Sequence, residues 1–187
     1  MKHRTNGWRL QFFRGGKIAP QPGRSFYMKD RNTEPDGFSD LCRSIGLAVL
    51  MGQKVQYALA SYYVVFMSVR KQIAMQETDV MLDMFLSNPM GKVIGEIRKN
   101  APLSQSLDAQ VNEFQKKRNW LVHDFDEEST PHIVRGQGIH EYIHNIQEIV
   151  AAAEALLHAL DKVGVDLLRE IDISPEHIRT LADQKRK

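Results

Sequence analysis

Residues 39–75 read SDLCRSIGLAVLMGQKVQYALASYYVVFMSVRKQIAM, and proline is absent from the whole stretch. Its apolar residues recur at steps of three and four, which is the period of an amphipathic helix. Ser39-Asp40 is a suitable N-cap, so we expect one long helix over residues 40–75. Gly46 and Gly52 either bend this helix or admit a close neighbour. The positions on its apolar face are Leu41, Ile45, Ala48, Gly52, Val55, Leu59, Tyr62, Phe66, Val69 and Ile73.

Shorter helices are expected in the rest of the chain, and capping residues mark where they begin and end. Asn88 is an N-cap, and Pro89 suits the first helical position because its missing N–H would have had no partner. Ser104 or Ser106 caps a later helix, and Gly164 ends the last long one. The predicted helices cover residues 77–86, 89–101, 104–123 and 139–163, with a polar loop over 124–136 and a short helix from Ser174-Pro175-Glu176.

These elements predict an all-α protein, an antiparallel helical bundle with a flexible N-terminal arm and a short C-terminal helix. The sequence has neither an alternating strand pattern nor an internal repeat. We expect three parts: a flexible basic arm over residues 1–38, a helical bundle over 39–173, and a short helix with a basic tail over 174–187. The arm is rich in glycine and proline and has no apolar period.

Composition limits the class of protein. The chain has 187 residues, of which 42% are hydrophobic, and this is enough for a single core. Its one cysteine, Cys42, excludes an internal disulfide and a CxxC zinc site. No apolar run approaches the roughly 18–20 residues of a membrane span, and no secretory signal follows the first residues. We therefore expect a soluble, cytoplasmic protein with no membrane partner.

The net charge of the chain is +2, but the charged residues are distributed unevenly along it. Residues 1–31 carry eight lysines or arginines and one acidic residue, whereas the rest of the chain carries 17 basic and 22 acidic residues. A basic arm on a mildly acidic body is suited to contact with nucleic acid. A solvated leader without a ligand explains the same charges, so the charge pattern leaves both interpretations open.

One stretch near the end of the helix over 104–123 carries the chemistry. It reads KRNWLVHDF over residues 117–125. Arg118 falls within an apolar stripe of this helix, and a guanidinium among apolar side chains is costly unless it is paired. Arg118 therefore needs a partner. The stripe consists of Leu107, Val111, Phe114, Leu121 and Phe125.

Asn119 and His123 lie beside Arg118 on the same helix. They are four residues apart, so their side chains share one flank. The imidazole titrates near neutrality, and the partial negative charge at the helix C-terminus favours its protonated form. On an ideal helix Arg118 and His123 point about 140° apart. They can share a substrate only if the last turn unwinds, if Arg118 reaches round, or if two subunits share the cleft.

This motif resembles that of the HEPN family, whose signature is an arginine, four to six residues and a histidine, commonly with a polar residue directly after the arginine. Arg118, Asn119 and His123 match it with a gap of four residues. The resemblance extends over about residues 40–165. It implies a homodimer in which motif helices from two subunits line one cleft, where RNA is cut without a metal or another cofactor.

The resemblance also implies a role for each matching residue. The ribose 2′-OH attacks the adjacent phosphate and leaves a 2′,3′-cyclic end. His123 assists proton transfer, Arg118 holds the phosphate and stabilises its developing charge, and Asn119 orients the pair. Gln53, Lys117 and Asp124 are supporting candidates.

A toxin with a cognate antitoxin protein, or a phage-defence component, is the expected biological setting. At the position of Phe125, toxins of this kind often have a tyrosine that the antitoxin modifies. Phe125 has no hydroxyl group, so the resemblance does not imply that form of regulation for this chain.

Two other functions remain open at this stage. Arg118 could pair with a carboxylate and lock the bundle, which would leave a non-catalytic HEPN-like module that binds protein or nucleotide. Residues 140–144 read HEYIH, in which His140 and His144 could bind zinc while Glu141 acts as the general base of a peptidase. Gln147 stands where the metzincin extension has glycine, and no edge strand is predicted for a peptide substrate. We therefore expect no metal site.

Overall fold

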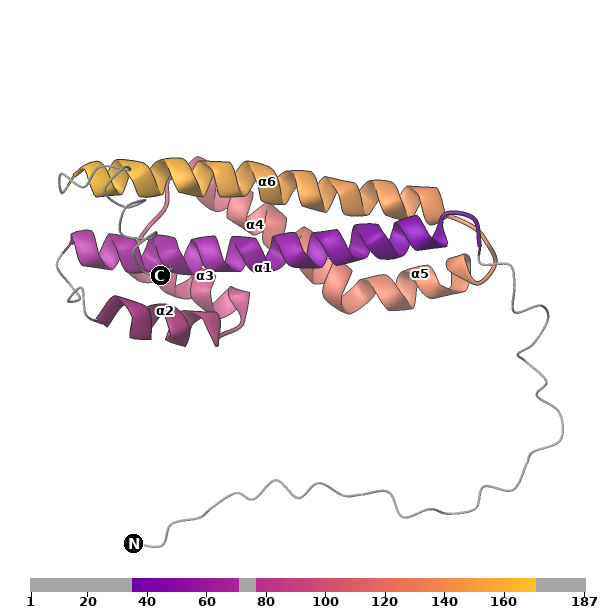
Figure 1. The fold of residues 1–187 in the computed structure, drawn as a ribbon, viewed down its shortest axis with the longest axis horizontal. Coiled ribbons are helices and arrows are strands. Elements are labelled where there is room, and N and C mark those ends of the chain that lie inside the picture. The colour runs from indigo at the N-terminus through magenta and orange to yellow at the C-terminus, as the bar shows by residue number, and fades with distance from the viewer. Residues whose placement is uncertain (1–34, 71–76, 171–187) are drawn as a thin grey trace, which may run out of the picture. The chain divides into compact units, whose positions relative to one another are not determined.

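The computed structural model describes residues 35–70 and 77–170, and within these ranges the chain is helical with no strand (Figure 1). The predicted all-α class is thus confirmed. Most of the predicted arm over 1–38 and the whole tail over 174–187 lie outside the described residues. The helices are α1 (Phe38–Val69), α2 (Thr78–Leu86), α3 (Met90–Asn100), α4 (Gln105–Asn119), α5 (Phe125–Ile133) and α6 (Ile139–Arg169), and a π-helical turn over Trp120–Asp124, here called the π turn, joins α4 to α5.

The two longest helices, α1 and α6, pack along each other, as Figure 1 shows. They run parallel, because Asp40 lies beside His140 in a groove at one end of the pair while Val65 lies beside Leu168 at the other. The chain reverses direction between α1 and α2, between α2 and α3, between α3 and α4, and between α5 and α6, whereas α4 continues into α5 through the π turn. Four such reversals separate α1 from α6, so the first and last helices share a direction.

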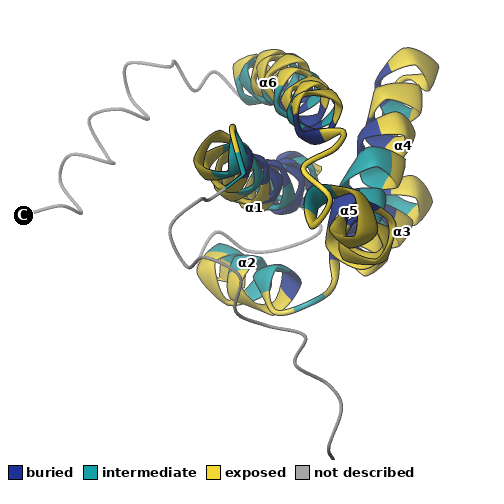
Figure 2. Ribbon diagram, turned by 90° about the vertical axis from the view of Figure 1, so that its right-hand side faces the viewer, coloured by how far each residue is buried: buried dark blue, intermediate teal, exposed yellow. Residues whose placement is uncertain are grey.

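The core lies between α1, α6 and the helices that cover them, and buried positions face this centre in Figure 2. α2 and α3 pack on α1, whereas α4 and α5 pack on α6. The apolar face predicted for residues 40–75 is largely buried where it is described. The stripe predicted on α4 is buried at all five positions: Leu107, Val111, Phe114, Leu121 and Phe125.

Two helix starts differ from the prediction. Helix α1 begins at Phe38, directly after Gly37, whose φ of 80° lies in the left-handed region that glycine tolerates. Asp40 is therefore inside the first turn, where it forms an ion pair with Arg43 at 3.1 Å. The helix ends at Val69, short of the predicted residue 75. At α3 the cap is Pro89, because the Asn88 amide donates instead to the Met84 carbonyl at 2.7 Å.

The segment over 124–136 was predicted as a loop, but α5 occupies most of it. Its acidic first turn is favourable at a helix N-terminus, and Phe125 and Ser129, four residues apart, are both buried. The turn to α6 is made by Gly136 and Gly138, whose φ values are 69° and 71°. Gly164 does not end α6, which continues to Arg169.

No helix within the described ranges is long and apolar enough to cross a membrane.

Candidate functional site

The Arg118 side chain lies where α4 crosses α1. Its stem passes Gly52, at which a Cβ atom would stand 3.8 Å from Arg118 Cγ. The buried glycine thus presents bare backbone to the stem, which is the close neighbour that the sequence allowed for at Gly52. Arg118 is half-buried, so the helix crossing covers part of its side chain and leaves the remainder accessible.

The guanidinium of Arg118 has a single side-chain hydrogen bond in the described part of the chain. Its Nη1 donates to Asn119 Oδ1 at 3.4 Å. No carboxylate oxygen of residues 35–70 or 77–170 comes within 4.0 Å of it. The alternative in which Arg118 locks the bundle through an acidic residue therefore finds no partner in these segments. A half-buried, unpaired guanidinium is a suitable binding group for an anion.

His123 lies one turn further along, in the π turn. The Phe125 N–H bonds the Trp120 carbonyl five residues back, in place of the four-residue spacing of an α-helix. An i→i+5 turn holds more residues than an α turn, so it narrows the 140° that separates Arg118 and His123 on an ideal helix. The π turn therefore brings the directions of Arg118 and His123 closer together, which a substrate shared by the two side chains requires.

The His123 imidazole is exposed and has no side-chain hydrogen bond or ion pair with the residues that the structure describes. The predicted Asn119–His123 pair is not joined by a hydrogen bond, because Asn119 Oδ1 accepts from Arg118 instead. The structure thus brings Arg118 and Asn119 together and leaves His123 free at the surface beside them.

None of the three supporting candidates forms a hydrogen bond with Arg118. Lys117 Nζ pairs with Glu148 of α6, with its nitrogen 3.2 Å from Oε2. Gln53 is exposed on α1, next to Gly52, and makes no hydrogen bond within the described segments. Asp124 is exposed and makes no side-chain bond at the start of α5.

Aromatic side chains that were not predicted from the sequence hold the π turn. Trp120 meets Phe125 edge-on, with ring centroids 5.5 Å apart, and Phe125 meets Tyr142 of α6 in the same way at 5.6 Å. Trp120 Nε1 donates to Glu128 Oε2 at 2.8 Å. The spacing of Phe114, Leu121 and Phe125 suits an uninterrupted α-helix, so apolar periodicity held no signal for the π turn.

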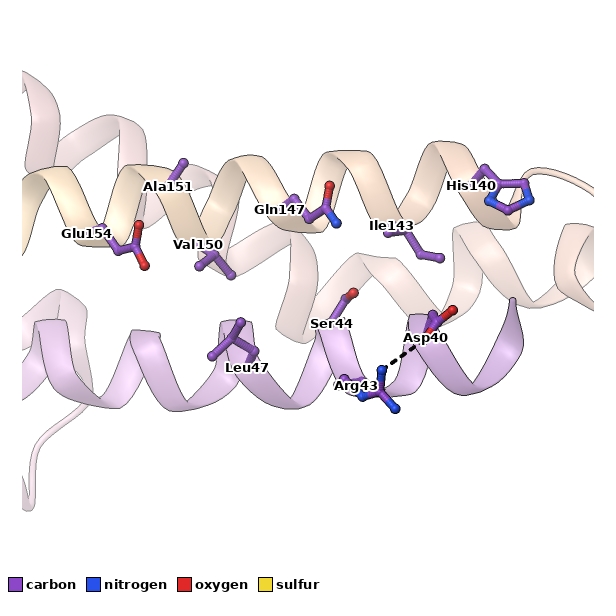
Figure 3. Close-up of a pocket in the computed structure, with 10 residues that line it drawn as sticks. All are labelled: Asp40, Arg43, Ser44, Leu47, His140, Ile143, Gln147, Val150, Ala151 and Glu154. Atoms are coloured by element: carbon purple, nitrogen blue, oxygen red, sulfur yellow. Dashed lines mark hydrogen bonds and ion pairs between the residues drawn. The ribbon is translucent and has the colours of Figure 1, made fainter. Parts of the chain in front are cut away.

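A groove of about 550 Å³ opens between the first halves of α1 and α6 (Figure 3). His140 lines its end, whereas His144 lies 3.7 Å from Glu148 and is not part of the groove. Within the described ranges, no three His, Cys, Asp or Glu side chains gather in a group that could hold a metal ion. The HEYIH pattern therefore has no third ligand there, and the zinc peptidase hypothesis gains no support.

No protein-family model, curated protein or solved structure matches this chain.

Proposed function

We propose that this protein is a metal-independent endoribonuclease of the HEPN type. The observation that carries the proposal is the unpaired Arg118 guanidinium, half-buried in an apolar stripe and lacking a carboxylate partner in the described chain. The accessible His123 imidazole on the π turn beside it supports the same conclusion. Together these groups offer a phosphate-binding cation and a group that can accept and donate a proton.

In the proposed reaction the 2′ oxygen of a ribose bonds to the adjacent phosphorus while the bond from phosphorus to the 5′ oxygen breaks. A neutral His123 imidazole accepts the proton of the 2′-OH, and a protonated imidazole supplies one to the leaving 5′ oxygen. Arg118 binds the phosphate oxygens, whose charge develops in the transition state. Two His123 copies facing one cleft of a homodimer would provide both imidazoles. The same proposal includes a biological role, either as a toxin with a cognate antitoxin protein or as a phage-defence component.

The test is cleavage of single-stranded RNA by the full-length protein in excess chelator. The wild type should cut and leave 2′,3′-cyclic phosphate ends, which mass spectrometry identifies. His123→Ala should lower the rate by about 10²–10⁴-fold, and Arg118→Ala by about 10²–10³-fold. His144→Ala changes another exposed histidine outside the motif and should leave the rate unchanged. Cleavage that survives both motif substitutions, or fails without added metal, contradicts the proposal.

A second candidate is a non-catalytic module that binds an anionic ligand through Arg118. It is favoured by one observation, the absence of a hydrogen bond from His123 to either Arg118 or Asn119. This alternative predicts that RNA or a nucleotide binds and remains intact. Loss of that binding in Arg118→Ala, together with normal binding by His123→Ala, would distinguish the module from the enzyme.

A further inference from the structure

A second hollow lies between α6 and the junction of α4 with the π turn. Its volume is about 310 Å³, at the lower end of the roughly 300–1,000 Å³ of small-molecule sites. Two of its lining residues, Lys117 and Trp120, directly precede Arg118 and directly follow Asn119 in the chain. Its lining consists of Lys116, Lys117, Trp120, Asn145, Glu148 and Ile149.

The indole of Trp120 lines this hollow and is held by a hydrogen bond and a ring contact. Its Nε1 donates to Glu128 Oε2 at 2.8 Å, and its ring packs against Phe125 in a T-shaped arrangement, with ring centroids 5.5 Å apart. Phe125 is in turn braced by Tyr142. The polar atom of the indole is already satisfied, so the half-exposed ring has only its π surface to offer a ligand. A ring that neighbouring side chains already hold in one orientation loses little conformational entropy when another flat ring stacks on it.

The remaining lining supplies polar groups suited to a nucleotide. Asn145 is half-buried, and its amide, which has both donor and acceptor atoms, forms no hydrogen bond with the described residues. Lys116 is exposed and has no ion pair there, whereas Lys117 and Glu148 neutralise each other at 3.2 Å. A free amide can bind the edge of a base, and an unpaired lysine can bind a phosphate.

We infer that this hollow is a nucleobase subsite, in which a base stacks on Trp120, contacts Asn145 through its edge and directs its phosphate toward Lys116. The inference rests on the proposed function, since it assigns the base to a nucleotide next to the phosphate bound by Arg118. Stacking on an aromatic side chain accepts any base. The subsite therefore contributes affinity and register along an RNA strand.

Fluorescence of Trp120 provides the test. Trp8 and Trp120 are the two tryptophans of the chain, so a full-length Trp8→Phe protein reports Trp120 alone. A 2′-O-methyl oligoribonucleotide is the main probe, because it has no 2′-OH and cannot be cut by the proposed reaction. It should quench the fluorescence in a saturable manner. A mononucleotide in a second arm shows whether a free nucleotide is bound as well, and quenching there also supports the subsite.

Two substitutions separate stacking from general packing. Trp120→Leu should weaken oligonucleotide binding, measured by calorimetry, by about 5- to 150-fold, which corresponds to the usual strength of a base–aromatic stack. Trp120→Phe keeps an aromatic ring and should bind within a few-fold of the wild type. Both variants need a normal circular dichroism spectrum and unfolding transition, and Asn145→Ala, which lies outside the aromatic cluster, should weaken binding too.

The outcomes distinguish the subsite from the nuclease. If RNA is never cut but the oligonucleotide or mononucleotide quenches Trp120, the proposed enzyme is wrong and the subsite stands. If RNA is cut through Arg118 and His123 while Trp120→Leu and Asn145→Ala bind like the wild type, the subsite is wrong. Absence of quenching by both probes also overturns the subsite. The hollow would then be expected to bind a side chain of a partner protein and not a base.

Discussion

Ser129 lies on α5 with only 1% of its surface exposed, and its hydroxyl has no hydrogen-bond partner within the described ranges. A buried hydroxyl without a partner costs free energy, because it has lost water and gained nothing in exchange. Ser129→Ala should therefore raise the free energy of unfolding, by about 1 kcal/mol. Urea denaturation followed by circular dichroism measures this change.

Ser104 is the matched control for that substitution. Its hydroxyl caps α4 by accepting a hydrogen bond from the Leu107 N–H at 3.3 Å. Ser104→Ala removes this cap and should lower the free energy of unfolding by about 1 kcal/mol. The same substitution, serine to alanine, should thus change the free energy of unfolding in opposite directions at these two positions. A loss of stability in Ser129→Ala as large as that in Ser104→Ala would mean that the Ser129 hydroxyl has a partner.

Tyr62 makes stability depend on pH in the alkaline range. Its hydroxyl is buried against the Ala101 carbonyl, to which it donates at 3.2 Å. Burial raises the pKa of Tyr62 above its ordinary 10.0, and nearby Arg70 offsets part of that rise. Well below pH 10 the phenol is protonated in both the folded and the unfolded chain. As the pH rises through the raised value, the unfolded state releases its proton first, so folding stability falls.

Tyr62→Phe should lose part of this alkaline destabilisation. Urea midpoints measured between pH 8 and about pH 11, a range set by the ordinary tyrosine pKa, should decline less steeply in the variant. At pH 8 the variant should be less stable by about 0.5–1.5 kcal/mol, because the Ala101 hydrogen bond is lost. Tyr57, which is exposed, provides the comparison, since Tyr57→Phe should leave the pH profile unchanged. Parallel profiles for Tyr62→Phe and the wild type would contradict the assignment.

At the scale of elements, the π turn is the feature that sets His123 relative to Arg118. A π turn differs from an α turn by one additional residue in the hydrogen-bonded loop. Deleting Val122, which is 47% exposed, should convert Trp120–Asp124 into regular α-helix while α4 and α5 keep their own packing. We expect near-wild-type helicity and unfolding temperature, together with loss of RNA cleavage, because His123 then moves on the helix surface.

A deletion inside regular α4 is the control for this variant. Removal of the exposed Glu113 should rotate everything before it by about 100° relative to the buried Phe114. That variant should lose stability strongly, since the stripe can no longer face the core. If deletion of Val122 is equally destabilising, the π turn is needed for folding. If it folds and still cuts RNA, the π turn is not needed for the proposed activity.

At the scale of the whole molecule, the proposed dimer makes a prediction that a monomeric site does not. Arg118→Ala and His123→Ala should each be inactive. A mixture of the two, unfolded together and refolded, should recover part of the cleavage rate if groups from both subunits serve one phosphate. Sedimentation over a concentration series should show a dimer. Activity that never returns in a mixture shown to contain heterodimers would place each complete site within one subunit.

Local patterns determined most of the helices of this protein, α5 being the exception. The three- and four-residue spacing of apolar side chains predicted α1, and the same spacing predicted the buried stripe from Leu107 to Phe125. Ser104 or Ser106 was predicted as the cap of α4, and Ser104 is the residue that caps it. This cap could be predicted because a capping side chain bonds a backbone N–H within its own segment. Such interactions depend on neighbours in sequence, and they can be read without knowledge of the fold.

Tertiary structure decided the rest. The parallel packing of α1 and α6, the continuation of α6 through Gly164 and the formation of α5 depend on contacts between segments far apart in the chain. The candidate site also depends on such contacts. The sequence showed that Arg118 is a charged residue in an apolar stripe. Its surroundings form only when α1, α4 and α6 meet: Gly52 lies against its stem, no carboxylate of the described residues pairs with it, and Trp120 lines the hollow beside α6. At these positions the free energy gained from burying apolar surface between helices exceeds the intrinsic conformational preference of the local sequence. Packing between helices removes more apolar surface from water than the contacts within a single turn do.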